Sequence, residues 1–213
     1  MERIIAQAEH YVRDFFAGEA SGHDAQHTFR VCALARRIAR MEGADEAVAA
    51  LAALLHDVDD RKVSPATCEN KDNARAFMAR EGVADDVQAE IIDIIRTMSF
   101  GGDGSTVPAT LTGRCVQDAD RLDAMGAIGI ARTFAFGGSR GRAIHDPDEA
   151  PDMHLSREAY AARQSTSVNH FHEKLLRLRD LMNTAEGRRL AQGRHDYMLA
   201  FLAQFHAEWR GDR

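Results

Sequence analysis

Cysteine, proline and tryptophan are all scarce in this chain, with three, four and one residues among 213. The three cysteines, an odd number without a C-x-x-C pair, fit a reducing compartment better than a disulfide framework. No apolar run reaches the roughly 20 residues of a membrane span, and the charged N-terminal residues are unlike a signal peptide. We therefore expect a cytoplasmic protein without membrane association.

Basic residues are in deficit, with 27 lysines and arginines against 33 aspartates and glutamates and a formal net charge of −6. This balance argues against a dedicated nucleic-acid surface, which is usually basic. It does not argue against a small anionic ligand held at one local site. The length is sufficient to bury a proper core.

Sustained alternation of β-branched and polar residues, the pattern of a strand, is absent too. Apolar residues instead recur at helical spacing, and few prolines interrupt them. We predict an all-α fold in a single domain, 1–213. The predicted helices cover residues 2–17, 24–41, 45–56, 71–81, 85–98, 110–135, 156–183 and 185–209, with loops at 100–108 and 135–154.

The chemistry concentrates at "LAALLHDVDD", residues 51–60, where an apolar run leads directly into a histidine and three carboxylates. An ionised carboxylate beside a core must be paired, hydrated or bound to a cation. His56 and Asp57 are adjacent, so they would diverge by about 100° on a regular helix. They can meet at one cation only where a helix ends, and the loop signals after Asp57 predict such an end.

Two other segments offer ligands of the same kind. "GHDAQHTFRV" (22–31) places His23 and His27 on one helix face, and "QDADRLDAMG" (117–126) holds Asp118, Asp120 and Asp123. One histidine, the His-Asp pair and one aspartate make a set of two nitrogens and two oxygens. That set suits Mn, Fe, Co, Ni, Zn or Mg. A water bound to such an ion is the nucleophile that phosphoester hydrolysis needs.

The arrangement H…HD…D resembles the HD-domain metal-dependent phosphohydrolase superfamily. Four blocks carry the resemblance over nearly the whole chain: "GHDAQHTFRV", "LAALLHDVDDRK", "VQDADRLDAMGAIGIARTFAFGG" and "NHFHEKLLRLRDLMNTAEGRRLA". They are similar to bacterial HD hydrolases of the type of the Bacillus nucleotide pyrophosphohydrolase. The resemblance implies an HD-type helical bundle, with an HD core at about 22–135 and a C-terminal helical extension at about 156–210.

The resemblance also implies roles for individual residues. His27, His56, Asp57 and Asp120 would be the metal ligands, and in "DADR" the ligand is the aspartate before the basic residue, hence Asp120 rather than Asp118. Asp60 would orient or deprotonate the attacking water, although a solvated loop carboxylate or a helix N-cap is the alternative. We assign no role to Asp59.

Basic groups must neutralise the phosphates of the substrate. The candidates are His23, Lys62, Arg121, Arg142 and His170. Four of them have a plainer interpretation: His23 can bond to Asp24, and Lys62, Arg142 and His170 can be ordinary solvent-facing residues. Since no histidine lies between His56 and His145, we expect one divalent metal ion, Mn first and Mg, Co, Ni, Fe or Zn as alternatives, rather than a binuclear centre.

The predicted activity is hydrolysis of a small phosphorylated substrate, a nucleoside or deoxynucleoside triphosphate, with release of pyrophosphate. A 5′-nucleotidase or a (p)ppGpp-type hydrolase is the enzymatic alternative. A metal-stabilised helical module that binds a nucleotide without turnover is the non-enzymatic one. Aromatic residues recur every four positions near the C-terminus, at 197, 201, 205 and 209, and predict either core packing or a homodimer face.

Overall fold

A computed structural model describes residues 1–18, 24–61, 63–100, 105–153 and 165–212. Within these ranges every regular element is a helix, so the predicted all-α class is confirmed. The chain divides into two compact units, one of Met1–Phe100 and Ser105–Asp120, the other of 101–104 and Arg121–Arg213. Across the described ranges, no helix combines the length and the apolarity needed to cross a bilayer.

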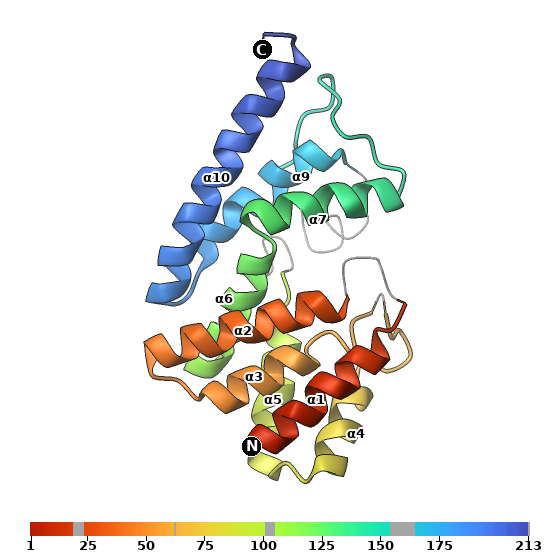
Figure 1. Ribbon diagram of the computed structural model, residues 1–213, viewed down its shortest axis with the longest axis vertical. Helices are drawn as coiled ribbons and strands as arrows, with labels where there is room; N and C mark the ends of the chain where they lie inside the picture. Colours follow the sequence, from red (N-terminus) through yellow and green to blue (C-terminus); the bar gives the residue numbers. More distant parts are fainter. Residues whose placement is uncertain (19–23, 62, 101–104, 154–164, 213) are drawn as a thin grey trace. The chain divides into compact units, whose positions relative to one another are not determined.

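The first unit is built around a helix that is apolar on all sides. Its elements are α1 (Glu2–Phe15), α2 (Ala25–Glu42), α3 (Glu46–Leu55), α4 (Asp72–Glu81), α5 (Asp85–Thr97) and most of α6 (Leu111–Asp123). Every residue of α3 from Val48 to Leu55 is buried, and α3 packs against α1, α2 and α5 (Figure 1). A helix without a polar face is stable only at the centre of a core.

Local chemistry sets where α3 begins. The Asp45 carboxylate accepts hydrogen bonds from the backbone N–H groups of Ala47 and Val48, at 2.8 and 2.9 Å. These are donors that the first turn of a helix cannot satisfy by itself. Asp45 is therefore the N-cap of α3, and the alanine and leucine residues that follow are strong helix formers.

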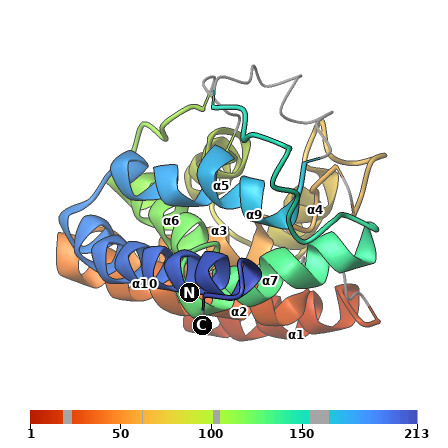
Figure 2. The ribbon, with the colours of Figure 1, turned by 90° about the horizontal axis from the view of Figure 1, so that it is seen from above.

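The second unit contains α7 (Gly126–Ser139), α9 (Ser167–Glu173), the 3₁₀ helix η1 (Leu175–Leu181) and α10 (Ala185–Trp209). α10 packs against α7 and η1, and α9 packs against α7 and η1 (Figure 2). The ring centroid of Phe134 lies 6.0 Å from that of Phe171 and 5.9 Å from that of Phe201. Phe201 is half-buried and packs among these aromatic rings, whereas Tyr197 and Trp209 are 57% and 48% exposed.

Two predicted helices are wrong as continuous elements. The segment 110–135 breaks after Asp123, because α7 begins anew at Gly126, whose φ of +69° is not helical. The described part of 156–183 is α9 followed by η1, separated at Lys174, whose φ and ψ of −135° and −62° are not helical. The predicted loop 135–154 starts later than expected, since α7 extends to Ser139.

Candidate metal centre

His27 is delivered by the first turn of α2. Asp24 is the N-cap of this helix, and its carboxylate accepts a hydrogen bond of 2.7 Å from the backbone N–H of His27. The His27 residue is only 2% exposed. The cap therefore fixes the backbone that carries a buried imidazole.

His56 and Asp57 lie at the opposite kind of helix end. His56 is the C-cap of α3, and Asp57 begins the turn that follows. The His56 Nδ1 atom lies 2.7 Å from the carbonyl oxygen of Ala53. A carbonyl oxygen only accepts, so Nδ1 carries the hydrogen and the neutral ring presents the Nε2 lone pair. Metal-bound histidines usually have this second-nitrogen hydrogen bond, which fixes ring orientation and tautomer.

Asp120, on α6, completes the group. His27 Nε2 lies 3.5 Å from Asp57 Oδ2 and 3.4 Å from Asp120 Oδ1. His56 Nε2 lies 3.2 Å from Asp57 Oδ1 and 3.9 Å from Asp120 Oδ1. When two ligand atoms each lie about 2.1 Å from one ion, they are about 3.0 Å apart at the ligand–metal–ligand angle of an octahedron. At the angle of a tetrahedron they are about 3.4 Å apart. The observed separations are close to this range.

The donor set fits a divalent cation. Ligand atoms of His27, His56 and Asp57 all lie within 4.8 Å of one another, and all three residues are buried. Among the described residues the buried Nε2 of His56 has no hydrogen-bond partner, although Asp57 is near. Two carboxylates and two imidazoles around one point leave a net negative charge that an ion of charge +2 would balance. A buried His/Asp group able to hold a metal ion is thus present.

The electrostatics of the site are dominated by the same four residues. Burial opposes charging of His56, but the carboxylates of Asp57 and Asp120 outweigh it and raise the pKa of His56 to about 9. Burial would raise the pKa of Asp120, yet its hydrogen bond with His27 and the charge of His56 lower it to about 2. The site favours positive charge at its centre.

The two aspartates that follow Val58 differ sharply. Asp59 is fully buried, and its two carboxylate oxygens accept hydrogen bonds from the backbone N–H groups of Asn73 and Ala74, at 3.1 and 2.9 Å. Asp60 is half-buried, and its backbone N–H donates to the Asp57 carbonyl at 3.0 Å. The sequence analysis gave Asp59 no role, and its pattern carried no signal for one.

Gln117 is a further residue that the sequence analysis missed. It is buried on α6, one turn before Asp120, and its Nε2 donates to the carbonyls of Met98 and Thr106 at 3.0 and 2.8 Å. These bonds tie the α6 turn that precedes Asp120 to the chain after α5. A glutamine within an apolar helical pattern gave a weak signal of such a role.

The predicted substrate-binding residues are dispersed in the chain. His23 and Lys62 lie outside the described residues. Arg121, Arg142 and His170 belong to the second unit: Arg121 is buried and donates to the Leu181 carbonyl, and the guanidinium of Arg142 lies 5.4 Å from the Phe136 ring centroid. His170 is half-buried on α9. Their contacts with a phosphate stay predictions.

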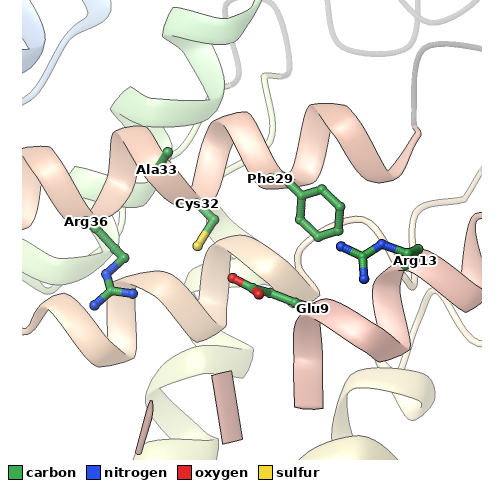
Figure 3. A pocket seen from close by; sticks show the side chains of 6 residues that line it. All are labelled: Glu9, Arg13, Phe29, Cys32, Ala33 and Arg36. Carbon is green, nitrogen blue, oxygen red and sulfur yellow. The ribbon is translucent and has the colours of Figure 1, made fainter. Parts of the chain in front are cut away.

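A separate surface pocket of about 290 Å³ lies between α1 and α2. Figure 3 shows Glu9 and Arg13 from α1 facing residues of α2, and the full lining is Glu9, Arg13, Phe29, Cys32, Ala33 and Arg36. The Arg13 guanidinium lies 5.4 Å from the centroid of the Phe29 ring. Of the predicted site residues that the structure describes, none lines this pocket.

Comparison with known proteins identifies the family. The model of the HD domain matches residues 24–125. The chain is 37% identical over 212 residues to the uncharacterized protein YpgQ of Bacillus subtilis, covering 97% of this chain and 96% of YpgQ. The His56-Asp57 pair of the chain lies inside the range that the HD-domain model matches.

Solved structures agree with this assignment. A protein of Lactobacillus plantarum is 40% identical with a TM-score of 0.86, covering 99% of this chain and 98% of its own. An HD-superfamily hydrolase of Bacillus thuringiensis is 36% identical with a TM-score of 0.77, covering 99% and 98%. YpgQ in complex with ADP is 33% identical with a TM-score of 0.75, covering 97% and 95%. The chain therefore belongs to the HD-domain proteins and is an HD-superfamily hydrolase.

Proposed function

We propose that this hydrolase is a metal-dependent phosphohydrolase that converts a nucleoside or deoxynucleoside triphosphate to the monophosphate and pyrophosphate. One observation carries the proposal: the convergence of His27, His56, Asp57 and Asp120 within 3.2–3.9 Å, with the His56 Nε2 lone pair directed at the group. The complex of the related YpgQ with ADP supports a nucleotide as the substrate.

The four residues would hold one divalent ion, with Mn as the first expectation. When bound, the ion would lower the pKa of a water molecule and neutralise charge on the phosphate. His56 serves as a neutral ligand because Ala53 keeps the hydrogen on Nδ1. The buried carboxylate of Asp57 contributes a full negative charge at the same point.

Asp60 is the residue we assign to the proton of the attacking water. It follows Asp57 by three residues in the turn closed by the Asp60 N–H to Asp57 carbonyl hydrogen bond. In the proposed reaction the water oxygen bonds to the α-phosphorus, Asp60 receives a proton, and the bond to the bridging oxygen of pyrophosphate breaks. The cationic candidates His23, Lys62, Arg121, Arg142 and His170 would neutralise the phosphates.

A nucleotide panel tests the proposal. Purified protein is assayed with mono-, di- and triphosphates and with Mn, Mg, Co and Zn, and both orthophosphate and pyrophosphate are measured. We expect equal amounts of monophosphate and pyrophosphate from triphosphates. Orthophosphate from monophosphates would indicate a 5′-nucleotidase instead, and pyrophosphate released only from (p)ppGpp would indicate that hydrolase class.

Two variants assign the residues. His56→Ala should lose both bound metal and turnover, whereas His10→Ala, which removes an exposed imidazole on α1, should retain both. Asp60→Asn should retain metal and lower kcat by about 10²–10⁴-fold, the range for loss of a general base. Full metal-dependent turnover in His56→Ala would rule out the proposed site.

A further inference from the structure

The turn that carries Asp57 is hydrogen-bonded to the N-terminus of α4, mainly through the carboxylate of Asp59. Lys71 occupies the N-cap position of α4 but provides no side-chain cap. The Asp59 carboxylate takes that place by accepting the N–H groups of Asn73 and Ala74, at 3.1 and 2.9 Å. These are the second and third residues of α4, where a capping oxygen is needed.

The same junction holds the backbone of the turn. Asn73 Nδ2 donates to the Val58 carbonyl at 3.0 Å, and Lys71 Nζ donates to the Asp59 carbonyl at 3.2 Å. Lys71 has a φ of +62°, and among the described residues it is the one non-glycine residue with positive φ. A strained conformation persists only where its surroundings over-determine it. The bonds to Asp59 and Val58 supply that constraint.

Burial makes this junction rigid. Val58 and Asp59 are both fully buried, and Asp57 is 6% exposed. When both oxygens of a buried carboxylate accept N–H groups, breaking these hydrogen bonds leaves buried polar groups unpaired and costs folding free energy. The backbone between His56 and Asp60 is therefore fixed on both sides, by α3 before it and by α4 after it.

We propose that Asp59 is a positioning residue for the metal centre: by capping α4 it holds the turn of His56 and Asp57 at the spacing that binds the ion. The inference rests on the proposed function, since it requires a metal at these ligands. It predicts that loss of the cap weakens metal binding, beyond any loss of stability.

Metal affinity and coordination spectra test this role. Asp59→Ala, Asp59→Asn and the control Asp45→Ala are titrated with Mn²⁺ by calorimetry and with Co²⁺ by visible absorption. Asp45 is the matched control because it also accepts two backbone N–H groups, at the other end of α3. We expect Asp59→Ala to bind Mn²⁺ roughly tenfold or more weakly, with a changed Co²⁺ spectrum. Asp45→Ala should lower Tm and leave affinity and spectrum unchanged.

The asparagine variant separates positioning from folding. Its single acceptor oxygen can keep one of the two N–H bonds, so we expect an affinity between those of the wild type and Asp59→Ala. If Asp59→Ala is unfolded by circular dichroism, Asp59→Asn is the deciding variant. Wild-type affinity and spectrum in a folded Asp59 variant would overturn the positioning role alone. A wild-type protein that binds these ions no better than His56→Ala would overturn the proposed function itself.

Discussion

Replacing Gly126 by alanine tests the break between α6 and α7, because the two interpretations of this segment predict opposite signs. Gly126 has a φ of +69°, which an L-residue adopts at a cost of about 1–2 kcal/mol. Its added Cβ would stand 3.1 Å from Arg194 Cγ, so that side chain must also shift. Alanine recovers about 0.4–1 kcal/mol by restricting the unfolded chain. We expect a net destabilisation of about 1 kcal/mol.

Gly193 is the matched control within the same unit. It lies in the interior of α10, is exposed, and its added Cβ would meet nothing within 4 Å. Gly193→Ala should stabilise by about 0.5–1 kcal/mol, as in any exposed helix interior. Urea denaturation followed by circular dichroism measures both variants, and Tm should fall by about 2–4 °C in Gly126→Ala. A Gly126→Ala protein more stable than the wild type would mean that the helix runs on through this residue.

The structure predicts three further outcomes. Gly129→Ala should destabilise more than Gly126→Ala, because its Cβ would stand 2.2 Å from the Ala124 carbonyl oxygen; urea midpoints compare them. Burial raises the pKa of Cys32 to about 11 and of Cys115 to about 12, so a thiol reagent at pH 8 should label one cysteine per native chain, Cys68; labelling of two or three would contradict this. Burial, and to a smaller extent the charges of neighbouring groups, lower the pKa of His206 below its usual 6.5. The stability that the folded protein gains from a neutral His206 should therefore be lost as the pH falls below 6.5. Urea midpoints at pH 7.5 and 5.5 should differ less in His206→Gln than in the wild type, and an equal difference would refute it.

Periodicity and capping chemistry predicted much of the helical framework. The α3 and α10 segments were placed to within a residue or two, because Asp45 and the apolar spacing are local signals. The break at Gly126 escaped because the apolar positions Leu122, Met125 and Ile128 continue at helical spacing across it. A glycine inside such a pattern is compatible with either a helix or a turn. The φ of +69° at Gly126, with Arg194 packed beside it, shows that this glycine is not in a helix that runs on from α6.

The metal ligand set was inferred from resemblance, and the structure adds geometry that no spacing contains. The Ala53 carbonyl that orients the His56 ring lies on the same helix, three residues earlier, yet it has no sequence signature because every residue has a carbonyl. Arg121 shows the converse. Its charge makes it a candidate for phosphate binding, which stays a prediction, and its buried side chain donates to the Leu181 carbonyl. Sixty residues separate these partners, so no local pattern links them.

Asp59 and Asp60 are adjacent and chemically identical, yet their surroundings in the fold suggest different roles. Both follow the His-Asp motif, and either could take a proton from water on chemistry alone. Each oxygen of Asp59 accepts a backbone N–H of α4 inside the core, so both oxygens are already engaged in a buried cap. A general base must instead gain and release a proton on every turnover. Asp60 is half-buried in the same turn and is the residue we propose for this role, whereas the carboxylate of Asp59 caps α4. The assignment of proton transfer to Asp60 therefore depends on where α4 begins, a position that the residues of the motif do not contain.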